Sequence, residues 1–371
     1  MKGLDLSRRF YFQCVKPIIA ERLPELSDNY AAGLIGYGSD VIGNDDELSR
    51  DHEWGPRCHL FLNEVKHKEL STELDNILRD NLPLEFSGFL TRFTLTDKMS
   101  IPTKDEFGYH HIVITTPKRF LELTIGKQGI PESDFEWLGI SEQRLLEFTA
   151  GEVFEDYIGE LTSLRKSLAY FPEDVWRFRL AFTLESLGWE DDLISQCGQR
   201  NDSISMYLNT SKTVERIMRL VFQLNKKYAP LYPKWLHREF HKLPEIAKDI
   251  EGELLGMLEA RDYHQKTEAL NRIYERLLMI MESQNICKSY PRKFRRSSSG
   301  VRFDIQSSAK DVLSTIQGEL KDVLINDMPL GAVDQWMLNE DIMLSAEHMK
   351  SLMSVYETDV PKRNKLGDLM I

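Results

Sequence analysis

Short apolar runs of strand length occur early in this chain and then stop. They lie at residues 31–37, 58–62, 86–93 and 111–115, and each is rich in apolar, aromatic or β-branched residues and bounded by turn formers. Helical periodicity precedes the first run at residues 5–24 and separates the second from the third at 68–82. This order predicts an α+β fold with a small mixed sheet.

Beyond about residue 130 the sequence has the pattern of helices alone. Pro172, Glu173 and Asp174 form a typical helix opening, and Gly188 is its predicted end. Further helices are predicted at residues 205–228, 244–260, 262–284, 308–325 and 345–357. We therefore predict two domains, a mixed one at residues 1–130 and a helical bundle at 131–371.

Composition and charge narrow the class of protein. No apolar run approaches the ~18 to 20 residues that cross a bilayer, and the first nine residues lack the apolar core of a signal peptide. We therefore expect a cytoplasmic protein without membrane association. The four cysteines lie far apart with no CxxC pair, which favours reduced thiols. The net charge of −12 disfavours non-specific binding to nucleic-acid phosphates.

The most informative chemical pattern is Gly38-Ser39 followed, after eleven residues, by Asp51-His52-Glu53. In an extended segment, alternate side chains point to one face, so the two carboxylates lie roughly 6 to 7 Å apart and are suited to bind a divalent cation. The apolar run before Gly38 ends in small residues, which let backbone amides approach a phosphate closely. The combination indicates metal-assisted phosphoryl or nucleotidyl transfer.

The same pattern resembles the signature of the polymerase-beta-like nucleotidyltransferase superfamily, in which hydrophobic-Gly-Ser precedes Asp-x-Glu or Asp-x-Asp by about ten residues. Longer strings are similar, more narrowly, to bacterial proteins of the DUF4037 group. These strings are Gly38-Ser39-Asp40, Ser-Arg-Asp-His-Glu-Trp-Gly-Pro-Arg at 49–57, Tyr-Phe-Pro-Glu-Asp-Val-Trp at 170–176, Lys227-Tyr228-Ala229-Pro230, Lys234-Trp235 and Val333-Asp334-Gln335. The resemblance spans most of the chain and implies a nucleotidyltransferase-like catalytic domain at residues 1–130.

The resemblance also implies a reaction. A nucleoside monophosphate would pass from an NTP, with ATP the first expectation, to a hydroxyl or phosphate acceptor, with release of pyrophosphate. In this scheme Asp51 and Glu53 bind Mg²⁺, and the Gly38 amide and Ser39 hydroxyl bind the β- and γ-phosphates. Arg57 offsets negative charge nearby.

One feature departs from the superfamily, whose members usually carry a third carboxylate on a later strand. The corresponding segment here, residues 109–114, contains histidines instead. His111 is therefore a candidate general base, because an unperturbed imidazole titrates near pH 6.5. Glu85 and Glu122 are alternative candidates. The absent acid leaves a second interpretation open, that of a catalytically inactive nucleotide-binding or protein-interaction module with the same fold.

Several basic residues outside the motif are candidates for substrate contact. Arg200 and Lys234 lie at segment ends in the helical half and would contact the triphosphate or acceptor, or else form surface ion pairs. Residues 283–303 contain no acid and interleave basic with aromatic side chains, as in a phosphate- or RNA-binding loop or a Ser-rich connection. The overall charge favours a small-molecule or protein acceptor over long nucleic acid, while this stretch leaves tRNA open.

Other nucleotide- and metal-binding motifs fail on spacing. The segment 36–41 has Val41 where a dinucleotide-binding GxGxxG motif requires its third glycine, and no GxxxxGK[ST] is present, which excludes Rossmann and P-loop interpretations. His237 and His241 have a spacing that can bind zinc, but no third ligand is evident in the sequence, so a solvated helix face is favoured.

Overall fold

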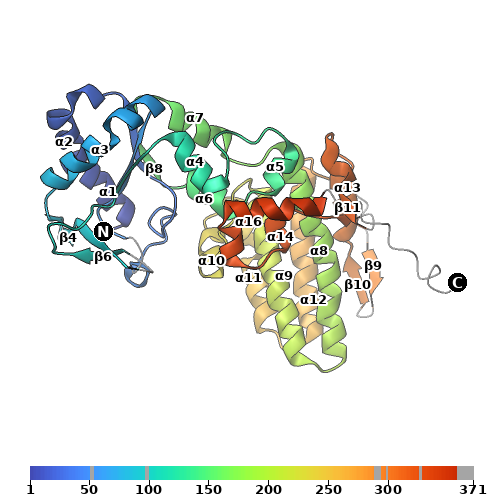
Figure 1. Cartoon of the computed structure of the whole chain (residues 1–371). Helices are drawn as coiled ribbons and strands as arrows, with labels where there is room; N and C mark the ends of the chain where they lie inside the picture. The colour runs from blue at the N-terminus through green and yellow to red at the C-terminus, as the bar shows by residue number, and fades with distance from the viewer. Residues whose placement is uncertain (51–53, 97–99, 288–293, 298–299, 326–327, 357–371) are drawn as a thin grey trace. The chain divides into compact units, whose positions relative to one another are not determined.

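The computed structural model describes residues 1–50, 54–96, 100–287, 294–297, 300–325 and 328–356 (Figure 1). The chain divides into two compact units. Unit 1 comprises Met1–Ile130 and Arg144–Ala169, and unit 2 comprises Pro131–Gln143 and Tyr170–Ile371. The chain first leaves unit 1 after Ile130, where the sequence analysis divides it, but it then returns for Arg144–Ala169.

Unit 1 is built around a mixed four-stranded sheet of order β7-β2-β1-β8. The central strand β1 pairs antiparallel with β2 and with β8, and β2 pairs parallel with β7. The four strands are β1 (Tyr30–Leu34), β2 (Cys58–Leu62), β7 (Ile112–Thr115) and β8 (Glu152–Asp156). Three of them coincide with predicted runs, and the predicted α+β class with a small mixed sheet is confirmed.

The strand β8 contradicts the prediction that strands end before residue 130. Its sequence, Glu-Val-Phe-Glu-Asp, is dominated by acids, which conceals the usual apolar pattern. Distant partners stabilise it, since Glu155 accepts hydrogen bonds from Lys16 and from the Tyr11 hydroxyl. Gly33 permits the close pairing, because a Cβ there would lie 2.6 Å from the carbonyl oxygen of Glu152.

Helices cover both faces of this sheet. The residues of β2 alternate, so that Cys58, Leu60 and Leu62 join one core cluster while His59 and Phe61 face the other way. The first face is covered by α1 (Gly3–Phe10), a π-helical segment (Tyr11–Val15), α2 (Lys16–Arg22) and α3 (Glu64–Asn81). On the second face, Phe120 contacts both rings at 5.1 and 5.4 Å between centroids. Phe120 belongs to α4 (Pro117–Ile125), which is accompanied by α6 (Glu142–Thr149) and α7 (Glu160–Ser167).

The predicted strand at residues 86–93 is not continuous. It is divided by Ser87 and Gly88, both with positive φ, which form a tight turn. The result is two small hairpins, β3 (Glu85–Phe86) with β4 (Phe89–Leu90), and β5 (Arg92–Leu95) with β6 (Ser100–Thr103). Short 3₁₀ turns at Pro24–Leu26 and Glu47–Ser49 complete the elements of unit 1.

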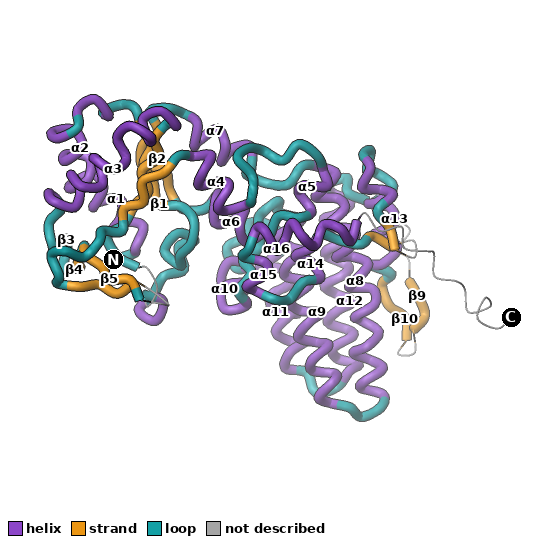
Figure 2. Tube along the Cα trace, in the orientation of Figure 1, coloured by secondary structure: helices purple, strands orange, loops and turns teal. Residues whose placement is uncertain are grey.

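Unit 2 consists mainly of helices packed side by side (Figures 1 and 2). In this bundle, α8 packs against α9, α12 and α13, and α11 packs against α9 and α12. The bundle helices are α8 (Glu173–Gln199), α9 (Ser203–Leu224), α11 (Ala247–Glu259), α12 (Tyr263–Ser283) and α13 (Gln306–Leu313). The helical half predicted from the sequence is therefore present in this unit.

Smaller elements surround the bundle. The short helices are α5 (Asp134–Leu138), α10 (Pro233–Phe240), α14 (Val333–Trp336), α15 (Glu340–Met343) and α16 (Ala346–Ser351), with 3₁₀ turns at Glu319–Asp322 and Leu352–Tyr356. Two hairpins join β9 (Phe294–Ser297) with β10 (Gly300–Phe303), and β11 (Leu324–Ile325) with β12 (Met328–Pro329). The first hairpin lies in the basic stretch, of which residues 288–293 and 298–299 lie outside the described residues.

Several predicted helix ends are wrong, and two of them have a clear structural context. The helix that begins at Glu173 continues past Gly188 to Gln199. Gly188 does not end the helix but allows α13 to approach closely, since a Cβ there would lie 2.5 Å from the Cβ of Gln306. The helix predicted at 308–325 ends at Leu313 and is followed by a 3₁₀ turn. In the described part of the chain, no helix combines the length and hydropathy needed to span a membrane.

Candidate functional site

The Gly38-Ser39 turn follows β1 in unit 1 and is closed by an ion pair between Asp40 and Arg57. Arg57 donates from Nη2 to Oδ1 of Asp40 at 2.6 Å and from Nε to Oδ2 at 3.2 Å. Its Nη2 also donates to the carbonyl oxygen of Tyr37 at 2.9 Å. Both charged side chains are buried. A buried charge requires such a partner, so the pair fixes the turn against the start of β2.

Gly38 is required by this arrangement. Its φ is +137°, a conformation that L-residues with a side chain rarely adopt. A Cβ at this position would also overlap Nη2 of Arg57 and Oδ1 of Asp40. The sequence analysis assigned this glycine to the close approach of a phosphate. The structure adds that the ion pair itself approaches the backbone here.

Ser39 begins the loop that leads toward the predicted metal ligands. Its hydroxyl donates to the carbonyl oxygen of Ser49 at 3.0 Å, and its own carbonyl accepts from the amide of Asn44 at 2.8 Å. The loop is therefore held at both ends by this residue. Across the described residues, neither the Gly38 nor the Ser39 amide donates a hydrogen bond.

The predicted metal ligands Asp51 and Glu53 lie outside the described residues. Their flanks are anchored, since the Arg50 guanidinium lies 4.4 Å over the Trp54 ring and Trp54 Nε1 donates to Asp45 at 3.1 Å.

The other aspartates of this loop are already engaged. Asp40 pairs with Arg57, Asp45 accepts from the Gly3 amide, and Asp46 caps a 3₁₀ turn. The remaining carboxylates of this loop are those of the exposed Glu47 and of the predicted ligands Asp51 and Glu53, and carboxylates are ligands that Mg²⁺ prefers. Elsewhere in the described residues, no group of three or more His, Cys, Asp or Glu is arranged to hold a metal ion.

His111 has an environment that disfavours its predicted role as general base. Its ring stacks on Phe93 with centroids 3.6 Å apart and an interplanar angle of 5°. Burial, reinforced by the positive charge of Arg57, lowers the pKa of His111 to about 3. The imidazole is therefore neutral near pH 7 and a weak proton acceptor. The alternative candidates Glu85 and Glu122 are both exposed.

Arg200 and Lys234 lie in unit 2 and make local contacts. Arg200 follows α8 and donates to the carbonyl oxygen of Gln196 at 2.7 Å. Lys234, in α10, lies over the rings of Tyr232 and Trp235 at 5.6 and 5.3 Å. These contacts are those of surface residues. On the same helix as Lys234, His237 and His241 both contact Glu251 of α11, at 2.9 and 3.1 Å.

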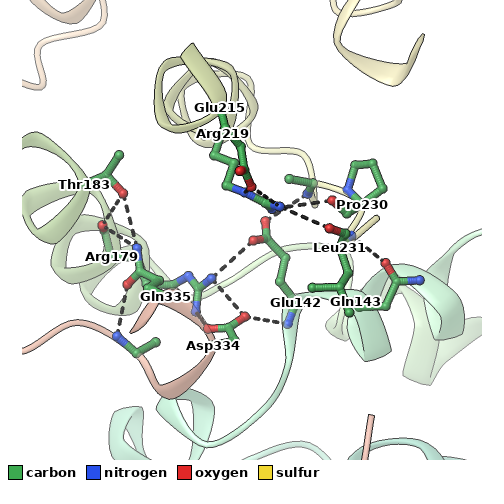
Figure 3. A network of polar contacts seen from close by, with 12 residues as sticks. Glu142, Gln143, Arg179, Thr183, Glu215, Arg219, Pro230, Leu231, Asp334 and Gln335 are labelled. Carbon is green, nitrogen blue, oxygen red and sulfur yellow. Dashed lines mark hydrogen bonds and ion pairs between the residues drawn. The ribbon is translucent and has the colours of Figure 1, made fainter. Parts of the chain in front are cut away.

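A buried polar network in unit 2 surrounds Arg179 of α8 (Figure 3). This side chain, 2% exposed, donates to Oδ1 and Oδ2 of Asp334 at 2.7 and 3.2 Å and to Glu142 at 3.2 Å. The Glu142 amide donates to Asp334 at 2.8 Å. Although burial alone would lower the pKa of Arg179, the two carboxylates raise it, so the guanidinium is a permanent cation.

The network also fixes the connection between α9 and α10. Glu142 accepts from the Ala229 amide and Gln143 from the Leu231 amide, each at 2.9 Å. Arg219 donates to the carbonyl oxygens of Pro230 and Leu231 at 3.4 and 3.2 Å (Figure 3). Beside this connection lies a cavity of about 340 Å³.

The sequence analysis did not identify Arg179. The available signal was a charged residue between Phe178 and Leu180, spaced three residues from Trp176 and four from Thr183 on a buried helix face. An arginine at such a position requires a buried acid. That acid, Asp334, belongs to one of the strings on which the family resemblance rests.

Comparison with known proteins gives a family match and several structural neighbours. Among curated proteins, no sequence matches this chain. Of solved structures, a nucleotidyltransferase-like protein from Exiguobacterium sibiricum shares 11% identity, covering 74% of this chain and 78% of its own, with a TM-score of 0.32, too low to establish a common fold.

The family match falls on the region of the Arg179 network. Residues 137–236 match the model of DUF4037, described as a domain of unknown function. This segment contains Glu142, Arg179 and Arg219, and it includes the strings at 170–176, 227–230 and 234–235 noted above. The Gly38-Ser39 motif lies before it. The match confirms the predicted DUF4037 resemblance for residues 137–236.

Proposed function

We propose that this protein is an Mg²⁺-dependent nucleotidyltransferase that transfers a nucleoside monophosphate from an NTP to a hydroxyl or phosphate acceptor, with release of pyrophosphate. The observation that supports it is the turn at Gly38-Ser39. This turn follows a buried strand, presents two amides that have no acceptor in the described residues, and begins the loop that contains Asp51 and Glu53.

Each residue has a role in this proposal. The Gly38 and Ser39 amides donate to the β- and γ-phosphates, because consecutive backbone N–H groups form an anion-binding concavity. The Ser39 hydroxyl exchanges its bond to Ser49 for one to a phosphate oxygen. Asp51 and Glu53 hold Mg²⁺, which when bound supplies charge neutralisation at the phosphates.

Arg57 has a positioning role and does not contact the phosphates in this proposal. Its pairing with Asp40 keeps the turn in the conformation that only glycine allows. Catalysis then rests mainly on orientation of the triphosphate and on neutralisation of its charge.

The weak basicity of His111 affects which kind of acceptor group the proposed reaction can use. A phosphate acceptor is ionised near neutral pH and needs no general base, whereas a hydroxyl acceptor needs one, for which Glu85 and Glu122 are the candidates in unit 1. ATP is the first NTP to test. The net charge of −12 favours a small molecule or a protein over long nucleic acid as acceptor, and tRNA remains to be tested.

A second function rests on the same observation about His111. With a neutral, buried histidine where the superfamily usually has a carboxylate, the protein would be an inactive nucleotide-binding or protein-interaction module. Stabilisation by ATP and Mg²⁺ in a thermal-shift measurement, together with no product from any NTP, would establish this alternative.

The decisive experiment is a product assay. The purified protein is incubated with α-labelled NTPs, Mg²⁺ and fractions of cell extract, and both label transfer and pyrophosphate are measured. We expect Asp51→Asn and Glu53→Gln to abolish transfer, while Glu47→Gln, an exposed acid of the same loop, remains active. Wild-type turnover in Asp51→Asn would show that the assignment is wrong.

A further inference from the structure

The cavity of unit 2 has the size of a small-molecule site. Its volume of about 340 Å³ lies at the lower end of the ~300 to 1,000 Å³ typical of ligand pockets. It is bounded by α9, by the connection from Ala229 to Tyr232 and by the segment that contains Asp334 and Met343. All of these residues belong to unit 2, whereas the Gly38-Ser39 turn belongs to unit 1.

One wall of the cavity is cationic. Lys212, Arg216 and Arg219 follow one another at spacings of four and three residues on α9, which places them on one helix face, and all three line the cavity. The Lys212 side chain is 61% exposed, while those of Arg216 and Arg219 are more enclosed. The hydrogen-bond donors of these three side chains therefore lie at different depths below the protein surface.

Carboxylates interact with all three cations of this wall. Glu190 accepts from Arg216 in a bidentate pair, 2.8 Å on each side, and lies 3.1 Å from Lys212. Glu215 pairs with Arg219 at 2.9 Å. Within this group two carboxylates face three cations, and Glu142, on another side of the cavity, also interacts with Arg219.

The acids on the other sides of the cavity are engaged or exposed. Glu142 and Asp334 share the single buried cation Arg179, as Figure 3 shows, so these three groups together carry one surplus negative charge. Glu340, which also lines the cavity, is exposed, so solvent screens its charge. Apart from Arg179, the cationic side chains of the cavity are thus concentrated on the α9 wall, which is where an anion would bind.

Part of the remaining lining is apolar, beside polar residues such as Gln143, Thr183 and Gln335. The apolar part comes from the α9–α10 connection and from the segment after Asp334, and consists of Leu231, Pro233, Met337, Leu338 and Met343. Apolar walls with a few placed polar groups are typical of sites for organic molecules, whereas an inorganic ion alone gains nothing from them.

A buried polar atom at the end of the cationic face points to a further contact. Gln223 follows Arg219 by one helical turn, lines the cavity and is 5% exposed, and its Oε1 has no hydrogen-bond partner. Buried carbonyl oxygens are nearly always paired. Since residues four apart on a helix are separated by about 6 Å along the axis, one small molecule can reach both Arg219 and Gln223.

We infer that this cavity binds a small organic anion: its phosphate or carboxylate contacts Lys212, Arg216 and Arg219, its apolar body packs on the methionine- and leucine-lined wall, and an N–H or O–H group donates to Gln223. This site is independent of the proposed NTP site in unit 1.

Isothermal titration calorimetry on the full chain, with probes that separate these features, tests the inference. Indoxyl phosphate and indole-3-acetate combine an anionic group, an aromatic body and an N–H donor, and they distinguish phosphate from carboxylate. Inorganic phosphate, indole and 1-naphthyl phosphate lack the body, the charge and the N–H respectively. At least one indolyl anion should bind tenfold or more tightly than inorganic phosphate and indole, and more tightly in low than in high salt.

Two variants locate the binding. Lys212→Gln should weaken the indolyl anion about fivefold or more, while Lys248→Gln, an exposed lysine of α11 outside the cavity, should not. Gln223→Leu removes an unpaired buried oxygen and should therefore fold normally. It should abolish the preference for indoxyl phosphate over 1-naphthyl phosphate.

Two results would overturn the inference: indolyl anions that bind no better than indole, or unchanged binding in both Lys212→Gln and Gln223→Leu. Unchanged binding in Asp51→Asn is expected, so failure of the proposed nucleotidyltransferase activity would leave this result unaffected.

Discussion

Asp40 and Arg57 form a buried, two-point ion pair across seventeen residues of sequence, and the backbone of Gly38 passes directly beside it. The pair ties the turn after β1 to the start of β2, the two strands at the centre of the sheet of unit 1. The proposed phosphate-binding turn is thus shaped by a salt bridge within the protein, and this has measurable consequences for stability.

We expect Gly38→Ala to destabilise unit 1 by about 2–4 kcal/mol, because the methyl group would both occupy an unfavourable φ and overlap the ion pair. Gly43→Ala is the matched control: its φ of +74° is also positive, but no atom lies within 4 Å of the added Cβ. That variant should cost only about 1 kcal/mol. Urea denaturation followed by circular dichroism compares them, and equal costs would show that the ion pair does not constrain residue 38.

Removal of both partners of the pair should cost less stability than the two single removals added together. Arg57→Ala or Asp40→Ala leaves a buried charge without compensation, which typically costs about 3–5 kcal/mol. The double variant removes both charges and should be less destabilised than the sum of the single changes. The double-mutant cycle therefore measures the coupling directly. Additive costs would mean that the two side chains do not interact in solution.

Unit 1 should lose stability as the pH falls from about 6.5 toward 3. Burial, with the charge of Arg57, lowers the pKa of both His59 and His111 to about 3, whereas histidine in an unfolded chain titrates near 6.5. Between these values the unfolded chain binds protons that the folded protein does not. The free energy of unfolding therefore decreases on acidification, by up to about 1.4 kcal/mol per pH unit for each histidine.

Denaturation at pH 7.5, 6 and 5 measures this slope. His111→Phe, which keeps an aromatic ring against Phe93, should reduce the slope, while His67→Gln on the partly exposed face of α3 should leave it unchanged. Identical slopes in the wild type and His111→Phe would mean that His111 is accessible to protons in the folded state.

The Arg179 network makes a corresponding prediction for unit 2. Asp334→Asn removes the carboxylate that accepts two hydrogen bonds from Arg179, leaving Glu142 as its remaining charged partner. We expect a loss of about 3 kcal/mol or more, because the guanidinium stays buried. Asp341→Asn, an exposed acid of α15, is the control and should change stability by less than about 0.5 kcal/mol. Differential scanning calorimetry of the three proteins provides the measurement.

The elements that the sequence predicts are those whose structure follows from the pattern of apolar and polar residues within the element itself. β2 was predicted at Cys58–Leu62, because five apolar or aromatic-rich residues are bounded by turn formers and both faces are buried. β8 could not be predicted in this way. Its acids are accommodated by Lys16 and Tyr11, from elements more than 130 residues away, and such partners leave no local signal.

In the candidate site, too, local features could be predicted and contacts between distant residues could not. The sequence analysis assigned Gly38 to the approach of a phosphate, whereas the groups that approach it in the structure are Asp40 and Arg57, the latter assigned to charge compensation near a ligand. Sequence spacing gives no means of pairing Arg57 with Asp40 in preference to other acids of the loop. Arg179 was missed because its acids, Glu142 and Asp334, are 37 and 155 residues distant.

Two glycines in helices of unit 2 should respond in opposite directions to the same substitution. Gly188→Ala adds a methyl group where the Cβ of Gln306 lies 2.5 Å away, and the resulting overpacking should cost about 1–3 kcal/mol. In Gly256→Ala, within α11, no atom lies within 4 Å of the added Cβ, so the higher helix propensity of alanine should stabilise the unit by about 0.5–1 kcal/mol. Urea denaturation of both variants tests whether Gly188 is retained for close packing of α8 against α13. If Gly188→Ala were also stabilising, the two helices would have to be farther apart than the structure places them.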